Sequence, residues 1–115
     1  MDNDRVKKAV ERYVGFRGWE ILDDETYIEE SIIIAHDTEE DQIAIVKYGA
    51  SEVGFEVEPM TLPEFECVML AYFASSDAPV DIVIRHDIID LHVIASDRAI
   101  IRHHVNVFGD LTSEV

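Results

Sequence analysis

The sequence contains five histidines, six serines and one cysteine that could take part in metal binding or nucleophilic catalysis. The adjacent His103 and His104 fall in a predicted strand and point to opposite faces, whereas His86 and His92 could share a face. With His36 the only other histidine, this spacing does not match a metal site, so we expect histidines that face solvent or form hydrogen bonds. The serines lie in no nucleophile-elbow motif, and the chain has no glycine-rich phosphate loop. These patterns argue against hydrolase and nucleotide-binding chemistry of those kinds.

The net charge is the strongest compositional signal. The chain has 25 acidic and 9 basic residues, a formal charge of −16 with neutral histidines. Nonspecific DNA affinity comes mostly from Lys and Arg side chains that displace counterions, so this balance disfavours nucleic acid and favours a protein as the partner. The acidic run over residues 36–41 separates two apolar segments and is predicted to form a solvated turn.

The length of 115 residues fits one domain, and the hydrophobic share of 48% suffices for a packed core. We predict a single domain over residues 1–108 and a flexible tail over 109–115. No apolar stretch reaches the roughly 18 residues that a membrane-spanning helix needs, and Met1 to Lys8 is a charged segment, so we expect a cytoplasmic protein without membrane contact. Cys67 has no second thiol for a disulfide or a thiolate metal site and is expected to fill space on a helix.

Apolar periodicity and turn residues divide the chain into helices and strands. Val10 and Val14 recur at helical spacing, and Gly18 provides a residue at which a helix can end in a left-handed turn. The segment 61–64 reads Thr-Leu-Pro-Glu, a capping box ahead of a second helix. Three successive isoleucines at 32–34 are typical of a strand covered on both faces. The predicted elements are a helix over 4–17, strands over 19–22, 31–35 and 43–48, a loop over 49–60, a helix over 62–75, and strands over 80–95 and 99–107.

These elements predict an α/β fold with a mixed central sheet of about five strands flanked by helices, in the order αβββαββ. This is the core arrangement of restriction-endonuclease-like domains. Three short motifs extend the likeness: Tyr-Val, Gly-Trp and Ile-Leu at 13–22, Arg-His-Asp-Ile-Ile at 85–89, and His-His-Val-Asn-Val-Phe at 103–108. They resemble segments of the bacterial YraN-like family, whose members resemble metal-dependent nucleases of the PD-(D/E)xK type. The resemblance spans residues 6–108.

The resemblance implies where a nuclease site would lie. Such enzymes hold Mg²⁺ with carboxylates on two adjacent strands and use a lysine to orient or activate the attacking water. The aspartate of the family falls at Ile32, its glutamate at Ile45 and its lysine at Lys47, while an assisting helix glutamate falls at Lys7. Because an isoleucine cannot ligate a hard cation, we predict that this metal-dependent cleavage is lost and that the domain has a degenerate site without a cofactor. Lys47 is then either a vestige of the site or a strand-end lysine in water.

An alternative keeps the enzyme class. Carboxylates from a loop or a neighbouring strand could approach Lys47 and rebuild a Mg²⁺ site, which would make the protein an endonuclease with a migrated active site. The candidate acids are Glu30, Glu56, Glu58 and Asp87. A register slip would return Glu30 to the site.

The remaining predictions concern partners. The hairpin over 80–107 has an outer strand whose edge is unpaired, which suggests a homodimer or pairing with another protein. Because isoleucines replace the two carboxylates and the net charge repels nucleic acid, we predict a non-catalytic nuclease-like domain that serves as a protein-binding or regulatory module. A further alternative is an acidic decoy that mimics DNA and occupies a basic protein.

Overall fold

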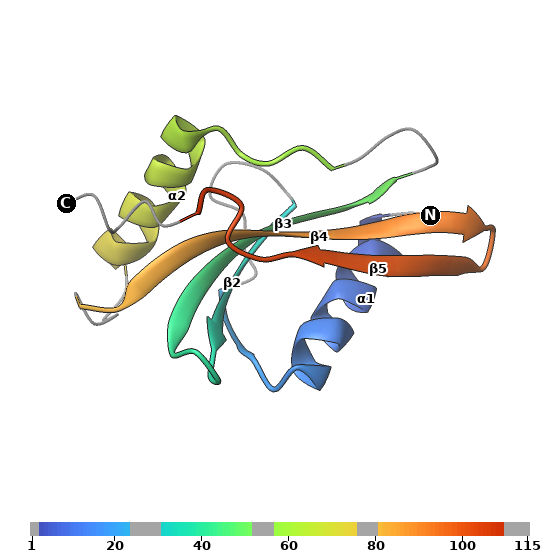
Figure 1. Cartoon of the computed structure of the whole chain (residues 1–115), viewed down its shortest axis with the longest axis horizontal. Helices are drawn as coiled ribbons and strands as arrows, with labels where there is room; N and C mark the ends of the chain where they lie inside the picture. The colour runs from blue at the N-terminus through green and yellow to red at the C-terminus, as the bar shows by residue number, and fades with distance from the viewer. Residues whose placement is uncertain (1–2, 24–30, 52–56, 76–80, 110–115) are drawn as a thin grey trace.

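The computed structural model describes residues 3–23, 31–51, 57–75 and 81–109, in which it places two helices and five strands (Figure 1). The predicted α/β class and the order αβββαββ are confirmed. The second helix has the predicted bounds, whereas the third strand is longer than predicted and the fifth is shorter. In chain order the elements are α1 (Asn3–Phe16), β1 (Glu20–Asp23), β2 (Ile32–Asp37), β3 (Gln42–Ser51), α2 (Leu62–Ser75), β4 (Val83–Ala95) and β5 (Arg98–His104).

The strands form one mixed sheet in the order β1-β2-β3-β4-β5. The first three strands form an antiparallel meander, β4 runs parallel to β3, and β5 returns antiparallel to β4. A parallel pair needs a crossover connection, and α2 lies in the connection between β3 and β4. Strands β1 and β5 therefore form the two edges of the sheet.

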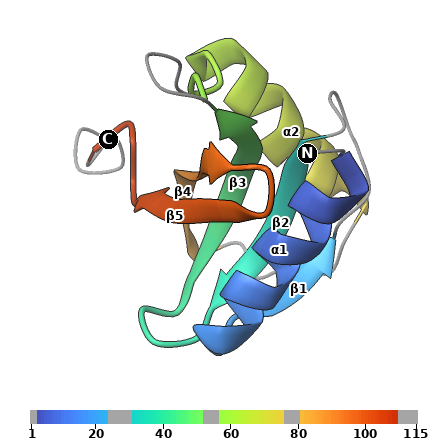
Figure 2. The same ribbon diagram turned by 90° about the vertical axis from the view of Figure 1, so that its right-hand side faces the viewer.

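The two helices cover opposite faces of the sheet, here named the α1 face and the α2 face (Figures 1 and 2). The central strands are covered on both sides, as the three successive isoleucines predicted. Neither helix in the described residues is long and apolar enough to cross a membrane. The buried apolar residues of the α1 face are Val6, Val10, Val14, Trp19, Ile33, Ala35, Ala44, Val46, Tyr48, Ile89 and Leu91. Those of the α2 face are Ile32, Ile34, Ile43, Ile45, Met60, Phe65, Val68 and Tyr72.

The two signals that predicted the end of the first helix and the start of the second have the expected geometry. Gly18 has a φ of 77°, the left-handed conformation in which a glycine ends a helix at little cost. The N–H of Trp19 then donates to the carbonyl oxygen of Val14 at 3.0 Å, which turns the indole onto the sheet. At α2, Thr61 and Glu64 cap each other through their side chains, with N–H to oxygen distances of 3.1 and 3.3 Å.

Candidate functional site

The three positions that the resemblance assigns to a nuclease site lie side by side on the α2 face. Ile32 of β2 pairs directly with Lys47 of β3. Ile45 precedes Lys47 by two residues in the same strand, so all three side chains point to one side of the sheet. The backbone thus has the arrangement that the prediction required: two adjacent strands and one shared face.

Both isoleucines belong to the hydrophobic core beneath α2. The exposed fraction is 2% for Ile32 and 1% for Ile45, and both pack in one cluster with Phe65 and Val68 of α2. Burying an isoleucine side chain contributes about 1.5–3 kcal/mol to stability, whereas a carboxylate buried there without a partner would be strongly unfavourable. These positions stabilise the fold and offer no oxygen to a cation.

Of the four acids considered for a rebuilt site, two belong to the described residues. Glu58 is exposed in the segment ahead of α2. Asp87 of β4 points to the α1 face, so the sheet separates it from Lys47. Glu30 and Glu56 lie outside the described residues. Within the described ranges, no group of three or more His, Cys, Asp or Glu side chains is arranged to hold a metal ion.

His86 fills the α2 face beside its cross-strand partner Ile45 and is completely buried. Its Nε2 accepts the N–H of Met60 at 3.0 Å, so Nδ1 carries the proton and donates to the carbonyl oxygen of Ile45 at 2.9 Å. The rings of Phe65 and Phe108 lie 5.8 and 5.1 Å from the imidazole. Burial lowers the pKa of His86 below 6.5. The neutral ring ties the segment before α2 to the centre of the sheet.

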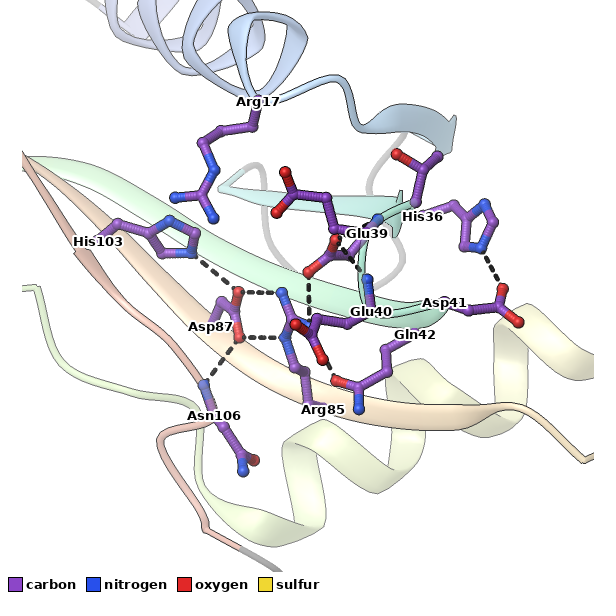
Figure 3. A network of polar contacts seen from close by, with 12 residues as sticks. Arg17, His36, Glu39, Glu40, Asp41, Gln42, Arg85, Asp87, His103 and Asn106 are labelled. Atoms are coloured by element: carbon purple, nitrogen blue, oxygen red, sulfur yellow. Dashed lines mark hydrogen bonds and ion pairs between the residues drawn. The ribbon is translucent and has the colours of Figure 1, made fainter.

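A network of buried charges occupies the α1 face (Figure 3). Arg85 donates to both carboxylate oxygens of Asp87, at 3.0 and 3.1 Å. Its Nη1 lies 2.9 Å from an oxygen of Asp37 and also donates to the side-chain oxygen of Gln42 at 2.9 Å. The exposed fractions are 5% for Arg85, 0% for Asp87 and 3% for Asp37. We call Asp37, Arg85, Asp87 and His103 the Asp87 network.

Asp87 also holds the end of β5. Its Oδ2 accepts a hydrogen bond from Nε2 of His103 at 2.9 Å, and its Oδ1 accepts the backbone N–H of Asn106 at 2.9 Å. Burial acts to raise the pKa of Asp87, but the hydrogen bonds from His103, Arg85 and Asn106 outweigh it, and the pKa is lowered. The ionised carboxylate thus joins β4 to the chain that leaves β5.

The prediction of a solvated turn over residues 36–41 was wrong for Asp37. This residue ends β2 and is 3% exposed, whereas Glu39 and Glu40 of the turn are exposed. One carboxylate oxygen of Asp37 accepts the N–H groups of Glu39 and Glu40 at 3.1 and 3.3 Å, and the other faces Arg85. Burial acts to raise the pKa of Asp37, but the Arg85 hydrogen bond and these N–H groups lower it. The prediction failed because Arg85, the counterion of Asp37, belongs to a strand that is distant in the sequence.

Tyr13 of α1 and Arg17 of the turn that follows α1 connect the Asp87 network to the surface. His103 donates to Asp87 through Nε2, and its Nδ1 forms a hydrogen bond of 2.8 Å with the hydroxyl of Tyr13. The exposed Arg17 donates to the same hydroxyl oxygen at 3.2 Å. This chain of contacts fastens α1 to β5.

Trp19 covers the network. Its ring lies 5.3 Å from the ring of His103 and 5.1 Å from the guanidinium carbon of Arg85, and Arg17 lies over it at 5.4 Å. The indole Nε1 is buried and makes no hydrogen bond to any of the described residues. An aromatic cover adds cation–π attraction and keeps water from the ion pairs, which strengthens them.

A second polar cluster lies on the α2 face of the three last strands. Asp90 of β4 is 2% exposed and accepts the hydroxyl of Ser51 at 2.7 Å. Arg102 of β5 donates to its other oxygen at 2.6 Å. Asp90 is therefore engaged by β3 and β5 and holds the edge hairpin to the centre of the sheet.

Sequence reasoning treated Asp87 only as a candidate acid and missed its partners. The available signal was alternation: Arg85 and Asp87 are two residues apart in an apolar strand and must share a face. A charged pair at this spacing in a buried strand predicts mutual neutralisation. The contacts to Asp37 and His103 carry no local signal, because each comes from a different strand.

We expect the free energy of unfolding to fall in two stages as the solution is acidified. The pKa of His86 in the folded state lies below 6.5, so below that pH the unfolded chain binds a proton that the native chain does not, and stability is lost. Asp37 and Asp87 have folded pKa values below 3.8; their stabilisation is present above that value and is lost as the pH falls through the folded pKa values.

Denaturant titrations across this range measure both stages. His86→Gln should flatten the first stage, which begins as the pH falls below 6.5, and leave the second unchanged. His92→Gln, at a partly buried position of the same strand, is the matched control. An unchanged slope in His86→Gln would contradict the assignment.

Comparisons of the chain with protein-family models, with curated proteins and with solved structures found no match. The resemblance to the YraN-like family therefore stays a prediction.

Proposed function

We propose that this protein is a non-catalytic, nuclease-like domain that serves as a protein-binding or regulatory module. The observation that carries the proposal is the burial of Ile32 and Ile45. On the face where a PD-(D/E)xK nuclease would place carboxylates around the lysine, this chain places two aliphatic side chains packed under α2. Because Mg²⁺ is bound through oxygen ligands, these two positions contribute nothing to a metal site.

The hydrogen bonds and ion pairs that the neighbouring acids already make also support the proposal over a migrated nuclease site. Asp87 lies on the opposite side of the sheet and is held by Arg85 and His103. Asp90 shares the α2 face with Lys47 but is bound by Ser51 and Arg102. A carboxylate that already accepts buried hydrogen bonds would have to break them to bind a cation.

Two surface features favour a protein as the partner. The formal charge of −16 repels nucleic acid. The segment 94–107, which contains the end of β4, all of β5 and the residues after it, also carries half of the ten exposed large hydrophobic side chains of the described residues, which suits a contact between proteins. These five side chains are Ile94, Ile100, Ile101, Val105 and Val107.

The proposal assigns the domain to the cytoplasm and gives it no cofactor. Cys67 is exposed on α2, so the prediction that it fills space was wrong. An exposed thiol suits a compartment that keeps thiols reduced.

The test is an assay for cleavage. The purified protein, incubated with Mg²⁺ or Mn²⁺ and with single- and double-stranded DNA and RNA, should cut none of them. Lys47→Ala is assayed beside it, because a contaminating nuclease would cut equally in both preparations. Cleavage that disappears in Lys47→Ala would overturn the proposal and support the migrated site.

A further inference from the structure

We propose that β5 pairs with β5 of a second copy of this chain, so that two five-stranded sheets become one continuous sheet across a two-fold axis. The inference rests on the proposed protein-binding function and names the partner: a second copy. Four features of β5 carry it, namely its place at the edge, its exposed side chains, its charge and its register.

The first feature is an open strand edge. β5 is the last strand of the sheet and pairs only with β4 among the described strands, and the hairpin extends along one side of the molecule to the end of its long axis (Figure 1). Such an edge presents a row of backbone N–H and C=O groups that can pair with another strand. A symmetric dimer satisfies both edges at once and leaves no new edge at the contact.

The second feature is apolar exposure on both sides of the strand. Ile100 is 52% exposed and Ile101 is 37% exposed, and as neighbours in a strand they point to opposite faces. A partner strand alongside β5 would cover part of both. A ligand that covered one face of the hairpin would leave the other isoleucine in water.

The third feature is the charge of this edge. The chain has 25 acidic residues, yet residues 98–109 contain none and form its longest stretch without an acid. Two copies that each carry a formal charge of −16 repel one another, and the repulsion is smallest where neither copy presents a carboxylate. This edge is therefore the side on which a second copy can approach at the lowest electrostatic cost.

The fourth feature is register, which restricts the position of the two-fold axis. Residues directly opposite in an antiparallel pair point to the same face. In a symmetric pair, residue i of one copy lies opposite residue j of the other copy, and j lies opposite i. The residue numbers i and j must therefore differ by an even number, so the two-fold axis lies between one residue and its own copy. Within β5 the central choices are Ile100, Ile101 and Arg102.

Repulsion between like charges distinguishes these three positions of the two-fold axis. An axis at Ile100 would place Arg98 opposite Arg102, and an axis at Arg102 would place that arginine opposite its own copy, and both arrangements are unfavourable. An axis at Ile101 avoids both and sets Ile101 against Ile101. Ile101 is also the midpoint of β5, so this register gives every residue of the strand a partner.

The experiment measures the oligomeric state and the register separately. Sedimentation equilibrium of the full chain should show a reversible dimer of twice the 13.1 kDa chain mass. Ile101→Lys places like charges at the axis and should weaken the dimer by at least roughly tenfold. Leu70→Lys makes the same charge change at a 64% exposed position of α2 and should leave the dimer unchanged. Circular dichroism checks that both variants fold.

Register is read by cross-linking, which does not depend on weakening the dimer. In a Cys67→Ser background, Ile101→Cys should form a disulfide-linked dimer faster than Ile100→Cys, because only the former brings the two thiols directly opposite one another. Equal rates would overturn the axis at Ile101.

A strict monomer at high concentration would overturn the self-pairing, as would a dimer broken by Leu70→Lys and not by Ile101→Lys. Neither result would make the protein a nuclease, so the non-catalytic proposal would stand. Cleavage of nucleic acid that requires Lys47 would remove the proposed function whatever the oligomeric state.

Discussion

Replacement of Arg85 by methionine is expected to destabilise the fold by about 3–5 kcal/mol, because it leaves two buried carboxylates without their counterion. Asp37 and Asp87 are 3% and 0% exposed, and Arg85 lies between them with contacts of 2.9 to 3.1 Å. Methionine preserves most of the side-chain volume, so the loss reports the charge and its hydrogen bonds. A domain is typically stable by only about 5–15 kcal/mol, so the effect is a large share of the total.

Urea unfolding at neutral pH measures this change. Arg12→Met, at an exposed position of α1, removes the same charge and should alter the free energy of unfolding by less than about 0.5 kcal/mol. The deficit in Arg85→Met should shrink as the pH falls toward the range in which the carboxylates bind protons. A loss no larger than that of Arg12→Met would mean that the Asp87 network does not stabilise the fold.

Local signals were sufficient to predict the helices. The capping box at 61–64 fixed the start of α2, and Gly18 supplied the left-handed residue that ends α1. Each signal is satisfied by contacts within a few residues, so tertiary structure does not alter it. The three isoleucines of β2 gave a signal of another kind: their unbroken apolar run indicated a strand buried on both faces, and packing of the two helices provides that burial.

Strand ends depend on distant partners, and the sequence was less informative there. The last strand was predicted to run to residue 107 but ends at His104. Asn106 has a φ of 56°, and its N–H donates to Asp87, while the next N–H, of Val107, donates to the carbonyl oxygen of His86. The chain therefore turns across β4 after β5. Asn106 is a residue type that tolerates the left-handed conformation, and the predicted strand ran past this signal.

The backbone arrangement of the candidate site could be predicted from the sequence, but the side chains that surround it could not. Adjacent strands and the spacing of two residues placed Ile32, Ile45 and Lys47 on one face, and the register confirms it. Whether that face is a cleft or a core depends on how α2 packs over it, and the packing involves Phe65 and Val68 from a segment with no motif in common with the strands.

Replacement of Ile45 by glutamate is expected to be the most damaging single change at the positions that the resemblance assigns to a nuclease site. Burial raises the pKa of a carboxyl group by up to about 3–5 units, so a glutamate with an ordinary pKa of about 4.3 would bind a proton at neutral pH. At about 1.4 kcal/mol for each unit between that value and pH 7, the loss is about 4 kcal/mol before the lost packing is added. Ile45→Val should cost only about 0.5–1.5 kcal/mol. Leu70→Glu, on the exposed side of α2, should have little effect.

Thermal unfolding of Ile45→Glu with and without Mg²⁺ tests most directly whether the face that the resemblance assigns to a nuclease site is core. The variant introduces the acidic residue that the YraN-like pattern would have two positions before Lys47. If Ile45 is core, the melting temperature falls far below that of Ile45→Val, and Mg²⁺ does not raise it. If the face is still a metal site, glutamate is tolerated, and Mg²⁺ or Mn²⁺ stabilises the variant in a saturable manner, which would contradict the account.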